Sequence, residues 1–198
     1  MKGNDKNKSQ EMASIPDNIN ANISPTDFEL LVKEYLVGAG KELKDFKAMH
    51  NVNLLKSDGE YQIDVYAEFE LLGASLKVIV ECKRHKSDIK REVVQVLYDK
   101  LRATGTHKGM LFSTSGFQSG AYLFAEEHGI ALIRVIDGKY TYVTKSHNEQ
   151  TFDPPPWADI PKYVGQYTKG ATTTFIQEGC FEVLGTFLFD NRMDSLKP

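Results

Sequence analysis

Three side chains that can do chemistry lie in one short stretch, between Asp64 and Lys83. Asp64 belongs to one predicted strand, residues 61–70, and Glu81 and Lys83 belong to the next, residues 76–83. The two strands are close enough in the sequence to form a β-hairpin, which brings both carboxylates and the ammonium group together. Two carboxylates at close range repel each other unless a cation or a proton lies between them. The pattern therefore predicts a metal-ion site with a lysine beside it.

The alternation of apolar residues predicts the register of this hairpin. A turn centred on Leu72–Gly73 pairs apolar residues with apolar residues, for example Val65 with Val80. The same register sets Asp64 directly across from Glu81, with Cβ atoms about 5 Å apart. The residues predicted to share the apolar face of the first strand are Ile63, Val65, Ala67 and Phe69.

This arrangement suits metal-assisted hydrolysis of a phosphodiester bond. Mg²⁺ prefers oxygen ligands at about 2.1 Å, so Asp64 and Glu81 would bind it and the backbone carbonyl of Cys82 would add a third oxygen. The ion would polarise a phosphate and lower the pKa of a bound water. Lys83 would orient or deprotonate that water, or stabilise the negative charge that builds on the phosphate.

A basic run begins at the predicted metal site. The whole chain has a net charge of −3, so only a local patch can favour nucleic acid. Arg84, Lys86, Lys90 and Arg91 form such a patch and are the predicted DNA-binding residues. A solvated loop followed by a helix start is the alternative interpretation of the same charges.

Composition and length set outer limits on the protein. With 198 residues, 41% of them hydrophobic, the chain can bury one core with an appendage. No apolar run approaches the ~20 residues that span a bilayer, and the first residues lack the apolar segment of a secretory signal. Two cysteines, Cys82 and Cys180, are too few for a disulfide framework or a thiolate zinc site. We therefore expect a cytoplasmic protein without a membrane partner.

The order of the expected strands and helices predicts an α/β fold, with a mixed sheet and helices on both of its faces. Ser24-Pro25-Thr26-Asp27 is typical of a helix start, and glycines at 38 and 40 of a helix end. Strands alternate with helices after the hairpin, which predicts parallel crossovers. The predicted strands cover residues 46–54, 61–70, 76–83, 109–114 and 130–136, and two further helices cover 89–103 and 119–128.

The two ends of the chain lack this regular pattern. Residues 1–22 are polar and aperiodic, which predicts a disordered arm, and the prolines at 154–156 separate a folded domain over 23–145 from an extension over 146–198. The extension has no role that the sequence assigns. The strands expected near and within it cover residues 140–144, 172–179 and 181–189, the last two as a small hairpin.

An acidic residue, sixteen intervening residues and then Glu-x-Lys, in αβββαβ order, resemble the PD-(D/E)xK nuclease superfamily. The downstream sequence resembles the catalytic domain of Mrr-type restriction endonucleases over about residues 24–138. The matching motifs are Phe28-Glu29, Ile63-Asp64, Glu81-Cys82-Lys83, the strand from Gly109 to Thr114 and the helix from Ser119 to Ala125.

The resemblance implies a restriction-endonuclease-like αβββαβ core over 23–145 and a Mg²⁺-dependent DNA endonuclease, with Mn²⁺ able to substitute. It implies Asp64, Glu81 and Lys83 as the core of the site and Glu29 as a helix acid that reaches the metal through water. Glu34 competes with Glu29 for that role. Many members of the family carry Gln where this chain has Glu81.

Several alternatives stay open at this point. Gln95, on the helix after the lysine, is either a site residue or a surface polar residue. The implied function is restriction or DNA defence on double-stranded DNA. A structure-selective repair nuclease of the junction-resolvase kind and a non-catalytic DNA-binding module fit the same scaffold, and symmetric cutting of two strands would require a homodimer.

Overall fold

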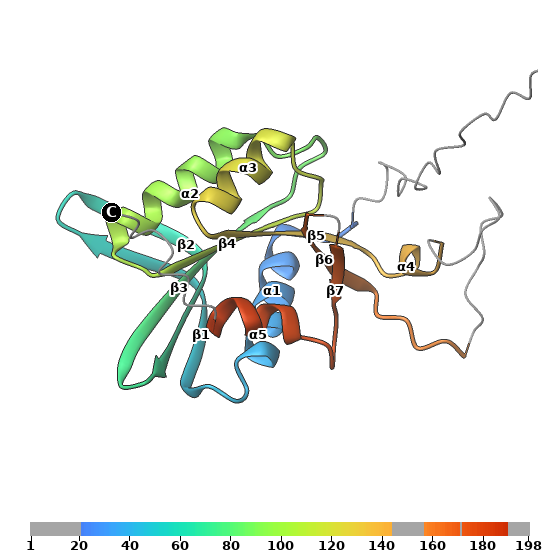
Figure 1. The fold of residues 1–198 in the computed structure, drawn as a ribbon, viewed down its shortest axis with the longest axis horizontal. Coiled ribbons are helices and arrows are strands. Elements are labelled where there is room, and N and C mark those ends of the chain that lie inside the picture. The colour runs from blue at the N-terminus through green and yellow to red at the C-terminus, as the bar shows by residue number, and fades with distance from the viewer. Residues whose placement is uncertain (1–20, 144–156, 171, 190–198) are drawn as a thin grey trace, which may run out of the picture.

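In the described part of the chain, residues 21–143, 157–170 and 172–189, the computed structural model shows a seven-stranded sheet with helices on both faces (Figure 1). The strands are β1 (Lys44–Lys56), β2 (Gly59–Leu71), β3 (Ala74–Lys83), β4 (Lys108–Ser113), β5 (Ile130–Asp137), β6 (Tyr163–Lys169) and β7 (Thr172–Ile176). The helices are α1 (Pro25–Ala39), α2 (Arg91–Thr104), α3 (Ser119–Glu127), α4 (Tyr140–Val143) and α5 (Glu182–Phe189).

The strands lie across the sheet in chain order. β3, β4 and β5 are parallel to their neighbours within this group, and the pairs β1–β2, β2–β3, β5–β6 and β6–β7 are antiparallel. Parallel neighbours need a crossover connection, and α2 and α3 supply the two crossovers. The predicted α/β class, with a mixed sheet and an αβββαβ core, is confirmed.

Helix α1 begins where its sequence predicts. Ser24 has extended backbone angles, its side chain accepts a hydrogen bond from the backbone N–H of Asp27 at 3.1 Å, and Pro25 occupies the first helical position. The helix ends at Ala39, with Gly40 as its C-cap. This fixed start matters for the site because Glu29 follows within the first turns.

The β2–β3 hairpin has the predicted register. Its ladder runs from Leu71 paired with Ala74 to Val65 paired with Val80. Leu72 and Gly73 form the turn with positive φ angles of 51° and 82°. The apolar pairing of Val65 with Val80 is therefore confirmed, but the ladder stops there, one position before Asp64 and Glu81.

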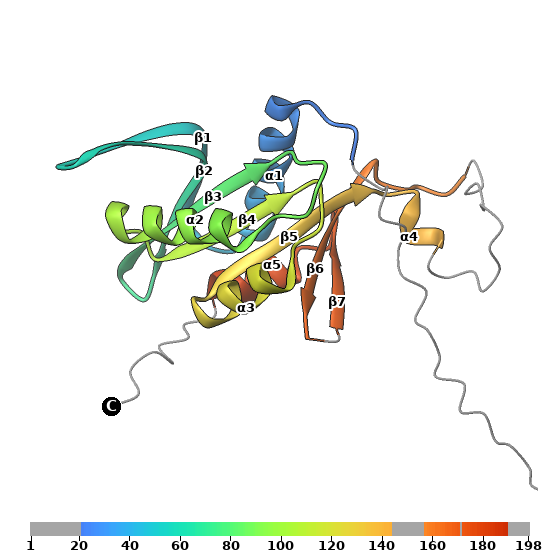
Figure 2. The same cartoon turned by 90° about the horizontal axis from the view of Figure 1, so that it is seen from above.

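The β1–β2 ribbon turns over beside Asp64. The prediction that Ile63 shares one face with Val65, Ala67 and Phe69 is therefore wrong. Val65, Ala67 and Phe69 pack in the core on the α1 side, whereas Ile63 packs in the core on the α2 side. Asn51 lies across from this point, between the pairs His50–Val65 and Val52–Ile63, and has a positive φ of 53°. Figure 2 shows the paired ends of β1 and β2 bending away from the rest of the sheet.

Two apolar cores lie on opposite faces of the sheet. α1 and α5 cover one face, and α2 and α3 cover the other (Figure 1). Strand β3 contributes to both, with Val78 and Val80 in the first core and Ile79 in the second. Glu81 continues the alternation of Ile79, so its side chain belongs to the α2 face.

The C-terminal predictions were wrong in two places. The expected hairpin arm over 140–144 is instead the short helix α4 up to Val143, and Thr144 lies outside the described residues. The expected strand over 181–189 is helix α5, because Leu184 and Leu188 repeat at helical spacing and are both buried. Strand β7 confirms a strand in the segment 172–179, and its hairpin partner is β6.

The described part of the extension adds to the sheet. β6 pairs with β5, and the hydroxyl of Tyr35 on α1 donates to the carbonyl of Tyr163 on β6 at 3.0 Å. Tyr163 in turn donates its hydroxyl to the carbonyl of Asn22 at 2.6 Å, and Ala21 is buried. These contacts tie residues 21 and 22, at the end of the predicted arm, to the extension; residues 1–20 lie outside the described part.

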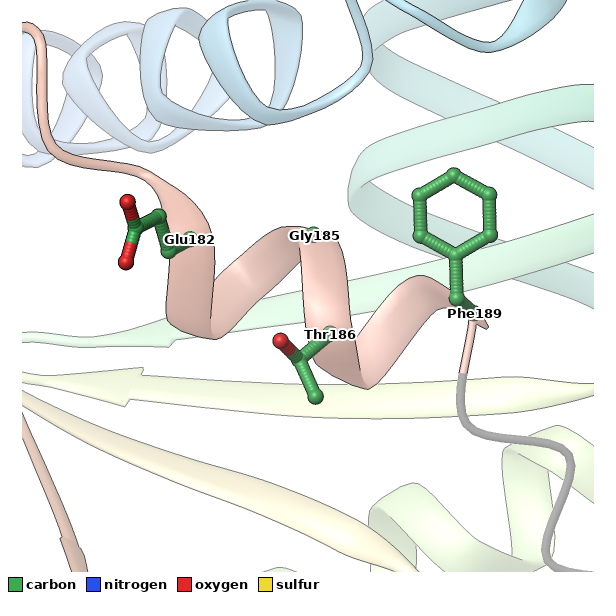
Figure 3. Close-up of a pocket in the computed structure, with 4 residues that line it drawn as sticks. All are labelled: Glu182, Gly185, Thr186 and Phe189. Atoms are coloured by element: carbon green, nitrogen blue, oxygen red, sulfur yellow. The ribbon is translucent and has the colours of Figure 1, made fainter.

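A pocket lies along α5 (Figure 3). Glu182, Gly185, Thr186 and Phe189 line it. The neighbouring carbonyl of Phe187 accepts a hydrogen bond from Lys108 at the start of β4, so this end of α5 lies at the amino end of the parallel strands. None of the predicted site residues belongs to this pocket. No helix in the described residues has the length and apolarity needed to cross a membrane.

The junction between β5 and β6 generates a stability prediction. A Cβ atom on Gly138 would collide with the backbone carbonyl oxygen of Pro161, and the Gly138 N–H donates to the carbonyl of Lys162 at 2.9 Å. Gly138→Ala should therefore lower the free energy of unfolding by about 1–3 kcal/mol, measured by urea denaturation. Gly120→Ala is the control, since its Cβ would meet only Arg91 at 3.8 Å and helix propensity favours alanine. Equal stabilities of the two variants would contradict this packing.

Candidate active site

The candidate site lies at the carboxyl end of β3, where β2 leaves its neighbour. Asp64 does not pair with Glu81 in the ladder, because the pairing ends at Val65 and Val80. Instead, Oδ2 of Asp64 accepts a hydrogen bond from the backbone N–H of Cys82 at 2.7 Å. The carboxylate takes the place that a strand carbonyl would have, so Asp64 is held against β3 by its side chain.

Glu81 is a buried carboxylate with an ammonium group on each oxygen. Its exposure is 5%, Lys83 Nζ lies 2.8 Å from Oε2, and Lys100 Nζ lies 2.6 Å from Oε1. A buried charge is costly unless it is paired and hydrogen-bonded, and here both oxygens are satisfied. Lys83 was predicted to lie beside the metal site; in the structure it pairs with Glu81, and a second lysine does so as well.

Lys100 is the residue that the sequence analysis missed. It lies on α2, and besides Glu81 it donates to the carbonyl of Gln62 at 2.9 Å. Lys100 follows Leu97 by three positions, and Leu97 is buried against the sheet, so helical spacing indicated that this lysine faces the sheet. The sequence does not show which residues of α2 lie over Glu81 on β3.

Glu29 on α1 approaches the same end of the sheet. Its Oε2 lies 2.6 Å from Nε2 of His50 on β1, and both side chains are about three-quarters buried. The charge of Glu29 raises the pKa of Asp64, which places the two groups in electrostatic range. The competing Glu34 is exposed, and its charge acts on Tyr35 instead.

The electrostatics of the site differ between its acid and its base. Burial raises the pKa of Asp64 above its ordinary value, and the negative charge of Glu81 adds to this effect. The hydrogen bond from Cys82 opposes the rise without cancelling it. Burial alone would lower the pKa of Lys83, but the charge and hydrogen bond of Glu81 outweigh burial and raise it. Lys83 is therefore an ammonium group, suited to stabilising negative charge rather than to accepting a proton.

The backbone of Cys82 faces the gap between the strands. The carbonyl of Lys83 accepts a hydrogen bond from the N–H of Thr114, the residue after β4, and successive residues of a strand point their backbone groups to opposite sides. Cys82 therefore directs its N–H and carbonyl toward β2, as its bond to Asp64 shows. The thiol packs in the core on the α1 side, and burial raises its pKa, so it stays protonated.

The donor set fits a hard divalent cation. Among the described residues, no three His, Cys, Asp or Glu side chains form a ready cluster, so the ligands would be two carboxylates and a carbonyl. The described residues donate no hydrogen bond to Oδ1 of Asp64, and the Cys82 carbonyl points into the same gap. Glu81 supplies a third oxygen if one of its two lysine partners moves off that oxygen. These are the oxygen donors that Mg²⁺ and Mn²⁺ prefer.

Three of the predicted DNA-binding residues lie on the loop between β3 and α2, the basic loop, and the fourth is the first residue of α2. Arg84, Lys86 and Lys90 are exposed between β3 and α2, and Arg91 begins α2 with its guanidinium 5.0 Å from the centre of the Phe124 ring. The backbone of this loop is anchored: the Ile89 N–H donates to the carbonyl of Gly116 at 2.9 Å. His85 is held by backbone bonds to Thr114, and its ring is exposed with these side chains; Gln95 is exposed on α2.

A polar row extends from Lys83 across the α2 face of the sheet. Lys83 is level with Ser113 on β4, and Ser113 is level with Arg134 on β5. Nε of Arg134 is buried and has no hydrogen-bond partner among the described residues. An orphaned buried donor of this kind is rare in native proteins. No sequence pattern indicated this arginine, because its position depends on the pairing of three strands.

Comparisons with known proteins find a matching family and a related protein. A family model described as a restriction endonuclease, the Mrr catalytic domain, matches residues 20–139. A type IV methyl-directed restriction enzyme of Escherichia coli, EcoKMrr, is 30% identical over 114 residues, which cover 56% of this chain and 35% of that protein. The chain thus spans about a third of the length of the curated relative that it matches.

Two solved structures are also similar. A protein of unknown function, AF1548, has a TM-score of 0.45 and 23% identity, covering 54% of this chain and 55% of its own. The MspJI restriction endonuclease in complex with a 27-mer oligonucleotide has a TM-score of 0.39 and 22% identity, covering 60% of this chain and 27% of its own.

The raised pKa of Asp64 generates a prediction about stability. A carboxyl group whose pKa is higher in the folded state stabilises the fold when protonated and loses that contribution as the pH rises through the folded pKa. Asp64→Asn, which stays neutral, should therefore raise the free energy of unfolding without metal at pH 7.5, by on the order of 1 kcal/mol. Urea denaturation from pH 4.5 to 8 should show the gain shrinking toward low pH. Asp99→Asn, at an exposed position of α2, is the control, and a loss of stability in Asp64→Asn would contradict the assignment.

Proposed function

Because the chain belongs to the Mrr catalytic-domain family of restriction endonucleases, we propose that it is a metal-dependent endonuclease that hydrolyses phosphodiester bonds of double-stranded DNA in restriction or DNA defence. The observation that carries the proposal is the meeting of Asp64, Glu81 and Lys83 at the point where β2 separates from β3. The separation leaves the edge of β3 beside Cys82 without a strand partner from β2, next to these acidic and basic groups.

Each protein group has a separate part in the proposed reaction. Asp64, Glu81 and the Cys82 carbonyl would hold a divalent ion, Mg²⁺ by preference, which when bound polarises the phosphate and makes its water more acidic. Lys83 stays protonated through its bond to Glu81 and stabilises the charge that develops on the phosphate oxygens.

The α1 acid and the basic loop would act around this centre. Glu29, held by His50, accepts a hydrogen bond from a water near the site. Arg84, Lys86, Lys90 and Arg91 contact DNA phosphates, which aligns the backbone with Lys83. A homodimer would cut both strands, and a cytoplasmic location suits the substrate; both remain predictions.

Removal of the site lysine should abolish cleavage. Lys83→Ala should nick supercoiled plasmid at least about 100-fold more slowly than the unaltered protein in Mg²⁺ or Mn²⁺, because it loses the charge that stabilises the transition state. Gel electrophoresis of the plasmid measures the rate. Lys77→Ala, at the other end of the same strand, is the control.

The substrates of this assay separate the alternative functions. Plasmids with and without methylated bases belong in it, since the Escherichia coli relative is named methyl-directed. A four-way junction cleaved in preference to duplex would favour a structure-selective nuclease. DNA binding without cleavage in either metal would favour the non-catalytic module, and full activity of Lys83→Ala would remove this site assignment.

The basic loop generates a prediction about salt dependence. Arg84→Ala and Lys86→Ala should each weaken binding to duplex DNA and reduce the slope of log affinity against log salt by about 1, because each removes one phosphate contact. Fluorescence anisotropy at several salt concentrations, without divalent metal, measures the slope. Lys41→Ala, in the turn that follows the far end of α1, should leave it unchanged. Equal slopes for all three variants would place the DNA elsewhere.

A further inference from the structure

Lys100 is positioned to decide how tightly the site holds a metal ion. It bonds Oε1 of Glu81 at 2.6 Å and the carbonyl of Gln62 at 2.9 Å, so one ammonium group joins α2 to two strands. We propose that Lys100 is a positioning residue whose ammonium group competes with the divalent cation for Glu81, and so sets the metal concentration at which the site fills. This inference rests on the proposed function and concerns a residue outside the Asp–Glu–Lys motif.

Competition follows from the occupancy of Glu81. Its side chain is 6% exposed and both oxygens already carry an ammonium group, so a cation can bind only where a hydrogen bond weakens. Two positive groups on one carboxylate also repel an incoming divalent ion. Removing either ammonium would favour the ion, but Lys83 is the group that the reaction requires. Lys100 is the partner that can be removed without losing the motif.

Lys100 has a second acceptor, which lowers the free-energy cost of breaking its bond to Glu81. When Oε1 of Glu81 turns to a cation, the ammonium group keeps its bond to the Gln62 carbonyl and is not left unpaired. Its side chain is 23% exposed, so water can supply a further acceptor. Gln62 precedes Asp64 by two residues, so the retained bond also holds the strand that carries the other carboxylate. Lys100 can therefore lose its bond to Glu81 and still keep its bond to β2.

The test measures metal binding directly. Lys100→Met keeps the length of the side chain and removes its charge, and it should bind Mn²⁺ about tenfold more tightly than the unaltered protein, the effect expected from one charge-assisted hydrogen bond. Isothermal titration with MnCl₂ in the absence of DNA measures the affinity. Lys100→Gln should bind tightly as well, while Lys100→Arg, which keeps the positive charge, should remain close to the unaltered protein.

Two further variants separate competition at Glu81 from a general effect of charge. Arg102→Met removes a positive charge from the same helix at an exposed position and should change the Mn²⁺ affinity less than twofold. In a Glu81→Gln background, Lys100→Met should lose most of its effect, because the contested oxygen has lost its charge. The pair Lys100→Gln and Lys100→Arg still decides the question if Lys100→Met does not fold.

Plasmid nicking by the unaltered protein, run in parallel, tests the proposed function independently. Tighter Mn²⁺ binding by Lys100→Met and Lys100→Gln supports the inference even if no DNA is cut. Equal or weaker binding by both neutral variants, or no binding by any of the proteins, overturns it. Equal binding together with plasmid cleavage would overturn the inference and leave the nuclease standing.

Discussion

The buried carboxylate of Glu81 is the interaction on which the rest of the site depends. A charge with 5% exposure is tolerated only when its oxygens are hydrogen-bonded to opposite charges, and here each oxygen has its own ammonium partner. One partner, Lys83, comes from the same strand at the next position on the same face. The other, Lys100, comes from the crossover helix that parallel pairing of β3 and β4 requires. The topology of the sheet therefore delivers the second cation to the site.

The β2–β3 ladder ends beside this charged cluster. Asn51 adopts a positive φ opposite Asp64, and β1 and β2 turn over together without a change of register. If the ladder continued, the backbone N–H and carbonyl of Cys82 would be hydrogen-bonded to β2. Because β2 leaves at this point, the Asp64 carboxylate serves as the acceptor for the Cys82 N–H, and the Cys82 carbonyl faces the gap. The bend is thus a structural requirement of the site.

The sequence predicted the parts of this fold that local chemistry decides. The Ser24 cap begins α1, and alternation sets the Val65–Val80 register, because each depends on residues that are neighbours in the chain. It failed where a long-range contact decides. The face of Ile63 depends on the bend at Asn51, and the role of Lys100 depends on where α2 crosses β3.

Helix α5 shows the same limit in the C-terminal extension. Its apolar run fits a strand as well as a helix, since eight residues are an ordinary length for a strand and short for a helix. The close packing of α1 and α5 helps to decide between them: a Cβ on Gly38 of α1 would lie 2.6 Å from Cζ of Phe181, the residue before α5. The candidate site residues could be proposed from the sequence because their motif is local, whereas α5 was misassigned because α1, against which it packs, is distant in the chain.

The site gathers like charges that the fold alone would not favour. Burial raises the pKa of Asp64, and the negative charges of Glu81 and Glu29 add to this effect. Two kinds of positive charge can relieve this repulsion. Ammonium groups do so from within the chain and hold the side chains in place without metal, whereas the divalent cation proposed for this site would bind Asp64 and Glu81 at once. The lysines keep the carboxylates in place before a metal ion binds, so the site is preformed. The more strongly the lysines bind Glu81, the more tightly a metal ion must bind to replace one of them.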